Sequence, residues 1–87
     1  HMQSVVIRVA PTRTPSMVTG VMREALASCG VLMRSPEPLV ALKSIDAATI
    51  VLELSYWVVT PADRIPARNE VLDVVYRHSK TAGLEFA

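Results

Sequence analysis

A long alternating segment, residues 48–60, constrains the fold more than any other part of the chain. Successive side chains of a strand point to opposite faces of its sheet. One face of this segment is entirely apolar and carries Ile50, Leu52, Leu54, Tyr56 and Val58. The other face mixes polar and apolar residues, namely Thr49, Val51, Glu53, Ser55, Trp57 and Val59. Because an apolar sheet face must be covered by a second layer, the pattern predicts a sheet with helices packed on one side.

The first third of the chain predicts a strand followed by a helix. Residues 4–10 are rich in β-branched side chains, which favour a strand. Thr14 is a good helix N-cap, and Pro15 suits the first helical position, where its missing N–H costs nothing. Apolar residues then recur every three or four positions, so we expect a helix over residues 15–28, with Gly30 as its stop signal.

Two prolines flank Glu37 in the segment after this helix. Each proline restricts its own φ angle and biases the preceding residue towards extended backbone. The Pro36-Glu37-Pro38 sequence therefore predicts a stiff structural connector that sets the entry angle of the next strand, residues 39–45. A tight turn at Asp46-Ala47 would lead from there into the alternating segment.

The last third predicts a second helix and the start of a fourth strand. Residues 61–66 are expected to form a loop, with Asp63 as the helix cap and Pro66 in the first turn. The helix would end at Gly83, and residues 84–87 begin a strand that is then cut off. Its apolar stripe is predicted to comprise Val71, Leu72, Val75 and Tyr76.

The order β-α-β-β-α-β predicts an α+β ferredoxin-like sandwich: a four-stranded antiparallel sheet with two helices on one face. Its 87 residues suffice for one domain. We assign residues 4–87 to this domain, with the fourth strand truncated. His1 and Met2 resemble an expression-tag remnant, so residues 1–3 are predicted to be a tag remnant and disordered start.

Composition and charge argue for a covered apolar surface and against a charged partner. The hydrophobic fraction is 51% and the mean hydropathy is +0.33, which is high for a small domain. The net charge is only +1, and no basic run resembles a nucleic-acid or membrane footprint. Arg8, Arg13, Arg23 and Arg34 give the first half a mild basic lean, which we interpret as a solvated face.

The sequence predicts no catalysis, no cofactor and no metal. Cys29 is the single cysteine, which fits a reducing compartment, and it lacks the spaced partners of a zinc site. His78 is the only histidine outside the first residue, and nothing in the sequence brings it to Cys29. We expect Cys29 to be a buried apolar residue and His78 to be a helix C-terminal cation or a surface residue. The apolar run Ile50–Val59 is too short for a transmembrane helix, which needs about 20 residues.

Trp57 is the most informative single residue. By alternation it lies opposite the core-facing set, on the sheet face that the helices leave open. Together with Val51 and Val59 it would form an exposed apolar strip, which is typical of a contact surface. We therefore predict a subunit interface at these three residues. The alternative is that Trp57 caps the edge of its own sheet and contacts nothing else.

The stretch from Val31 to Val59 resembles the cytoplasmic C-terminal α/β domain of the small-conductance mechanosensitive ion channel family. The residues that carry the resemblance are Val31-Leu32, Pro36-Glu37-Pro38, Val40, Val51 through Trp57-Val58, and the closing Gly83-Leu84-Glu85-Phe86. Two departures stand out. The first strand runs into residues 10–13 rather than a Tyr and an Asp-rich turn, and the closing strand stops at Ala87 before the usual prolines.

The resemblance implies a structural role in ion transport. Such channels are rings of seven identical subunits, so the expected partners are identical subunits in a homo-heptamer and the parent's own membrane and middle β domains. This domain would complete a vestibule on the cytoplasmic face of the inner (plasma) membrane, without touching the membrane or nucleic acid itself. An alternative of another class is a free-standing ferredoxin-like regulatory domain that binds a small ligand, although the loop after the first strand lacks the glycines such domains use.

Overall fold

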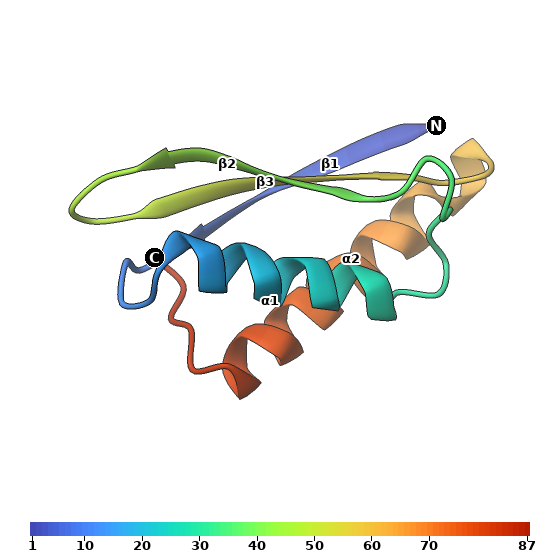
Figure 1. The fold of residues 1–87 in the computed structure, drawn as a ribbon. Helices are drawn as coiled ribbons and strands as arrows, with labels where there is room; N and C mark the ends of the chain where they lie inside the picture. Colours follow the sequence, from blue (N-terminus) through green and yellow to red (C-terminus); the bar gives the residue numbers. More distant parts are fainter.

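The computed structural model describes residues 1–87 as a sheet covered by helices on one side (Figure 1). Its elements in chain order are β1 (Met2–Val9), α1 (Pro15–Ser28), β2 (Leu39–Ile45), β3 (Ile50–Trp57), the short 3-10 helix η1 (Pro61–Asp63) and α2 (Arg64–Thr81). The three strands form one antiparallel sheet in the order β1-β3-β2. Both helices lie on the same face of this sheet.

The predicted alternation of β3 is confirmed along its whole length. Ile50, Leu52, Leu54 and Val58 are fully buried, and Tyr56 is nearly so, while the residues between them are half-buried. Val5, Ile7 and Val9 of β1 are buried on the same face because they pair directly with Leu54, Leu52 and Ile50. The core therefore lies between this face and the two helices.

Helix α1 begins and ends where the sequence predicts. The Thr14 Oγ1 accepts a hydrogen bond of 3.1 Å from the Met17 N–H, as an N-cap residue should. Val18, Met22, Ala25 and Leu26 are its buried residues, and Cys29 follows them into the core. Gly30 keeps a negative φ, so the helix does not end in a left-handed glycine.

The end of α1 is instead held by a side chain from the connector. The Arg34 guanidinium donates to the carbonyl oxygens of Cys29 at 2.9 Å, Ala27 at 3.1 Å and Leu26 at 3.4 Å. The last carbonyls of a helix lack partners within the helix and carry a partial negative charge. The Arg34 guanidinium donates hydrogen bonds to these carbonyls and also offsets their partial negative charge. This explains why the helix needs no glycine cap. The Ser35–Pro36 peptide in the same connector is cis.

Several element boundaries differ from the predictions. α2 already begins at Arg64, inside the expected loop of residues 61–66, and the Asp63 side chain makes no capping hydrogen bond to it. β1 begins at Met2 rather than residue 4, because Met2 and Gln3 pair with Trp57 and Tyr56. β3 begins at Ile50 rather than residue 48, because Asp46 Oδ1 accepts hydrogen bonds from the Ala48 and Thr49 N–H groups and holds them in the turn. β3 ends at Trp57 rather than residue 60, because Trp57 pairs with Met2, the first residue of β1.

The predicted apolar stripe of α2 is partly wrong. Its buried residues are Ala67, Val71, Val74, Val75 and Ser79. Leu72 and Tyr76, which were predicted to face the core, are 38% and 55% exposed. The small residues Ala67 and Ser79 occupy core positions instead and are fully buried.

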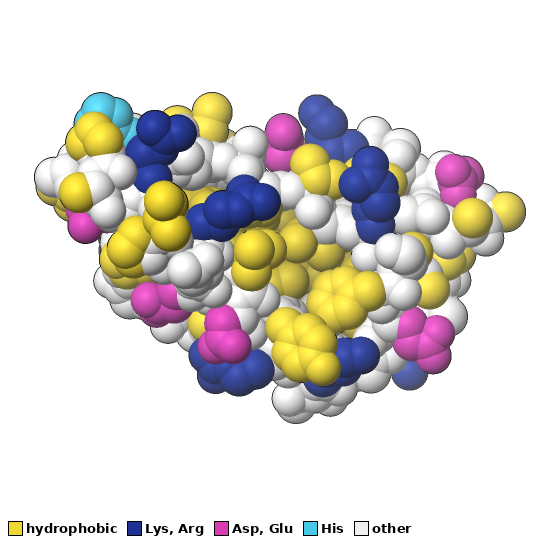
Figure 2. Space-filling model, turned by 180° about the vertical axis from the view of Figure 1, so that it is seen from behind, with side chains coloured by type: hydrophobic (Ala, Val, Ile, Leu, Met, Phe, Trp, Pro, Cys, Tyr) yellow, Lys and Arg dark blue, Asp and Glu magenta, His cyan; other side chains and the backbone are white.

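The fourth strand is reduced to one bridge. Gly83 adopts φ 77°, which turns the chain after α2, and Leu84 then enters the core. Val9 and Phe86 form an isolated antiparallel bridge, with hydrogen bonds from Ala10 N–H to Glu85 O and from Ala87 N–H to Arg8 O. The sheet therefore has three strands, and the rest of the β1 edge has no strand beside it. On the side seen in Figure 2, hydrophobic side chains form a band between the sheet and the helices.

Candidate functional site

The open face of the sheet carries two of the three residues that the sequence predicts for a subunit contact, Val51 and Trp57. Directly paired residues point to the same side, so the register arranges this face in four rows. From one end the rows are Met2–Trp57, then Ser4–Ser55–Leu39, then Val6–Glu53–Ala41, and finally Arg8–Val51–Ser44. None of these side chains belongs to the buried core.

The register separates Trp57 from Val51. Ser55 and Glu53 stand between them on the same face, and Glu53 forms an ion pair of 3.7 Å with Lys43. Val51 lies between Arg8 and Ser44 in the last row. Val59 lies beyond the end of β3 and is 69% exposed, so it is not a sheet residue at all. The three predicted residues therefore do not form one continuous strip.

The apolar surface gathers instead at the Trp57 end of the sheet. Trp57 is half-buried, and Leu39, in the next row on β2, is 54% exposed. Val6 is also 49% exposed, but it lies two rows from Trp57, beside Glu53. We name the pair Leu39 and Trp57 the open-face cluster. Sequence reasoning missed Leu39 because a bulge between Leu42 and Ser44 breaks the alternation of β2, so its faces cannot be read from the sequence alone.

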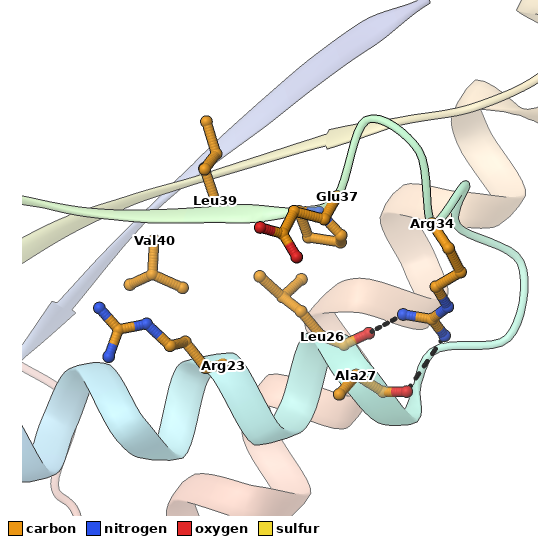
Figure 3. Close-up of a pocket in the computed structure, with 8 residues that line it drawn as sticks. Arg23, Leu26, Ala27, Arg34, Glu37, Leu39 and Val40 are labelled. Carbon is orange, nitrogen blue, oxygen red and sulfur yellow. Dashed lines mark hydrogen bonds between the residues drawn. The ribbon is translucent and has the colours of Figure 1, made fainter.

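A second concave site lies between α1 and the start of β2 (Figure 3). The predicted connector residues Glu37 and Pro38 line it, so the connector forms part of a cleft. Pro36, the first connector residue, is exposed and is not among the lining residues. Arg23 and Arg34 line the same cleft from α1 and from the connector. Sequence reasoning had treated these arginines only as part of a solvated face.

No hydrogen bond joins the two residues considered for catalysis, Cys29 and His78. Cys29 is fully buried, and burial, assisted by the negative charge of Glu70 and a side-chain hydrogen bond to it, raises its pKa to about 11. Its thiol therefore stays protonated near neutral pH, whereas nucleophilic cysteines need a thiolate. His78 Nε2 lies 3.4 Å from the hydroxyl of Ser28. No group of three or more His, Cys, Asp or Glu side chains is placed to hold a metal ion.

Neither helix of the structure combines the length and apolar character that crossing a bilayer requires. Besides Lys43–Glu53, the chain has one ion pair, in which Arg77 Nε donates to Asp73 at 2.8 Å on the exposed surface of α2. Such pairs contribute little to stability and mark no binding site.

Comparison with solved structures gives a clear result for the fold. Two cryo-EM structures of MSL1 from Arabidopsis thaliana, a mechanosensitive channel, superpose on all of this chain with a TM-score of 0.81 and 14% sequence identity. This chain shares its fold with part of MSL1. A variant of MSL1 superposes with the same TM-score and identity. The chain spans about a third of the length of these channel subunits, since 32% to 35% of each is covered.

The likeness is structural rather than one of sequence. No protein-family model matches the chain, and no curated protein sequence matches it. The family resemblance inferred from Pro36-Glu37-Pro38 and the long strand nevertheless points to the same class of protein as the structural neighbours.

Proposed function

We propose that the chain is the cytoplasmic α/β domain of a small-conductance mechanosensitive channel, serving as an assembly module without catalysis. The observation that carries this proposal is the superposition of the whole chain on MSL1 with a TM-score of 0.81. In the full-length protein the domain would complete a vestibule on the cytoplasmic face of the inner membrane, in a ring of seven identical subunits beside the middle β domain. A completed fourth strand on the free edge of β1 would give it the four-stranded ferredoxin-like sheet.

Within that role, the open-face cluster is the proposed contact with a neighbouring subunit or domain. Trp57 and Leu39 are large apolar side chains on a sheet face that no element of this chain covers. Aromatic anchors supply much of the binding energy of many interfaces. Burying the exposed part of Trp57 in a complex would contribute about 1–2 kcal/mol, from the general value per unit of apolar area.

The Trp57→Ala variant tests this contact, in both the isolated chain and the full-length protein. In the isolated chain we expect a small loss of stability, because Trp57 is half-buried and lies outside the core. In the full-length protein we expect incomplete rings, measured by native mass spectrometry or size-exclusion chromatography with light scattering. Trp57→Phe is the matched control and should assemble normally, since it keeps an aromatic anchor.

Two outcomes would overturn the proposal. Normal rings from the full-length Trp57→Ala protein would remove the contact role. An isolated Trp57→Ala chain that unfolds would show that Trp57 stabilises the domain itself.

The channel assignment has a separate test in the full-length sequence, where apolar runs of about 20 residues are expected upstream of this domain. A fused enzyme domain in their place would contradict it.

A further inference from the structure

The cleft between α1 and β2 has the size of a small-molecule site. Its volume is about 430 Å³, within the range of about 300–1,000 Å³ that is typical of ligand pockets. The residues that line it are Arg23, Leu26, Ala27, Arg34, Glu37, Pro38, Leu39 and Val40. Figure 3 shows α1 on one side of it and the start of β2 on the other.

The side chains at the middle of the cleft are apolar and are held in place by the core. Leu26 is buried to 98%, since only 2% of its surface is exposed, and Val40 packs against the core from β2. In Figure 3 both side chains point into the space between the helix and the strand. An aliphatic group of a few carbons could therefore lose its contact with water there, which is favourable by the hydrophobic effect.

The charged groups of the cleft differ in whether they already have partners. Arg34 is committed, because its guanidinium donates to three carbonyl oxygens at the end of α1. Arg23 and Glu37 have no hydrogen-bond partner and no ion-pair partner in the chain, and no ion pair joins them to each other. The cleft thus presents one free cation from α1 and one free carboxylate from the connector, with the apolar pair Leu26 and Val40 nearby.

We propose that this cleft binds a free amino acid with an aliphatic side chain. Its carboxylate would accept hydrogen bonds from the Arg23 guanidinium, whose planar fork suits a carboxylate. Its ammonium group would donate to the Glu37 carboxylate, and its side chain would lie against Leu26 and Val40. An anion without an ammonium group would meet repulsion from Glu37, and a cation without a carboxylate would meet repulsion from Arg23, so the site favours a zwitterion.

The cleft shares one residue, Leu39, with the open-face cluster and is otherwise separate from it. Arg23 and Glu37 are both exposed, so each charged contact is weakened by water. We therefore expect millimolar affinity, which suits the sensing of an abundant metabolite rather than its tight capture.

The probes are three commercial compounds: L-leucine, N-acetyl-L-leucine and L-leucinamide. Each is titrated into the ¹⁵N-labelled chain while backbone amide shifts are recorded by NMR. Leucine should cause saturable shifts at Leu26, Ala27, Leu39 and Val40. N-acetyl-leucine lacks the ammonium group and leucinamide lacks the carboxylate, so each should bind about tenfold more weakly, as expected for the loss of one hydrogen-bonded charge.

Two variants test which residue recognises the carboxylate of the ligand and which recognises its ammonium group. Arg23→Gln should abolish the preference for leucine over leucinamide, and Glu37→Gln should abolish the preference for leucine over N-acetyl-leucine. Arg68→Gln and Glu24→Gln are the controls, since each removes the same charge from an exposed position that does not line this cleft. All four positions are exposed, and the spectra themselves report whether the fold is retained.

Three results would overturn the proposal. The first is the absence of saturable shifts at the cleft residues with leucine at concentrations well above the millimolar range. The second is equal binding of leucine and both derivatives, which would show that neither charge is recognised. The third is an unchanged preference in both Arg23→Gln and Glu37→Gln.

Discussion

Arg34 shows how a single side chain can replace a local backbone signal. Gly30 follows α1 by two residues and would be the natural helix stop, yet it does not adopt the left-handed conformation. The three hydrogen bonds from Arg34 satisfy the terminal carbonyls instead. A capping side chain five to eight residues away in sequence leaves no periodic signal, so the sequence could not predict it.

Replacing Arg34 tests this role. Arg34→Ala should lower the free energy of unfolding by about 1–2 kcal/mol, because it leaves helix-end carbonyls without their charged donor. The measurement is the urea midpoint of the isolated chain. Arg34→Lys should restore only part of the stability, since one ammonium cannot reach three carbonyls as a guanidinium does. Arg68→Ala is the control for removing an exposed arginine, and an equal effect from both Ala variants would contradict the capping role.

Cys29 predicts a specific pH dependence of stability. Its pKa rises from the ordinary value of 9.0 to about 11 in the folded chain, because burial and then Glu70 disfavour the thiolate. The unfolded chain therefore loses this proton at lower pH than the folded chain does. The stabilising contribution is complete below the unfolded pKa and is lost as pH rises through the folded pKa.

Urea midpoints measured across this alkaline range should thus fall more steeply for the wild-type chain than for Cys29→Ala. The comparison between the two removes the contribution of other groups that titrate at high pH, including Tyr56, whose pKa burial also raises. Parallel profiles for the two chains would show that Cys29 does not titrate in this way.

At the scale of elements, the sequence predicted those features that are set within a single strand or helix. The bounds of α1 and β2 and the two faces of β3 follow from capping residues, prolines and strict alternation, which are local properties. The α2 stripe was partly wrong because Leu72 and Tyr76 resemble core residues by type, while Ala67 and Ser79 do not. Which side of a helix meets the core depends on its neighbours, and the sequence of the helix does not contain that information.

The C-terminal segment is a second case where neighbours decide. Tyr76 stacks on Phe86 with ring centroids 6.1 Å apart, and Lys80 Nζ lies 5.4 Å from the Tyr76 ring and 5.7 Å from the Phe86 ring. These contacts join α2 to residues that only bridge to β1. They are exposed, so they add less to stability than the buried Leu84 beside them.

A matched pair of variants separates these contributions. Leu84→Ala should lower the free energy of unfolding by about 2–4 kcal/mol, because Leu84 is 3% exposed and its loss leaves a cavity. Phe86→Ala should cost about 1 kcal/mol, the size of an exposed aromatic contact. Chemical denaturation of the two variants gives both values. A larger loss from Phe86→Ala than from Leu84→Ala would mean that the aromatic stack, and not the core, holds the segment.

At the scale of the whole molecule, one layer of helices leaves the other sheet face open. The sequence predicted this open face and placed Trp57 on it, because alternation along one strand was enough. It did not predict how residues of different strands combine there, since that depends on pairing register. The register puts Trp57 near Leu39 and separates it from Val51. The cleft between α1 and β2 was missed because it depends on how the helix packs against the strand, which the sequence of neither element gives.

The central claim is that assembly of the full-length protein covers the open sheet face, and thiol labelling at Ser55 measures this most directly. Ser55 lies between Trp57 and Glu53 on that face, and the native Cys29 is fully buried, so a Ser55→Cys variant places one reactive thiol there. Its maleimide labelling rate, read by peptide mass spectrometry, is compared between the isolated chain and the assembled full-length protein. Ser16→Cys, at the exposed start of α1, is the control. The account predicts that assembly slows labelling at position 55 at least about tenfold, as for a residue that becomes buried in an interface, while labelling at position 16 changes little. Equal rates at position 55 in the isolated chain and in the assembled protein would contradict it.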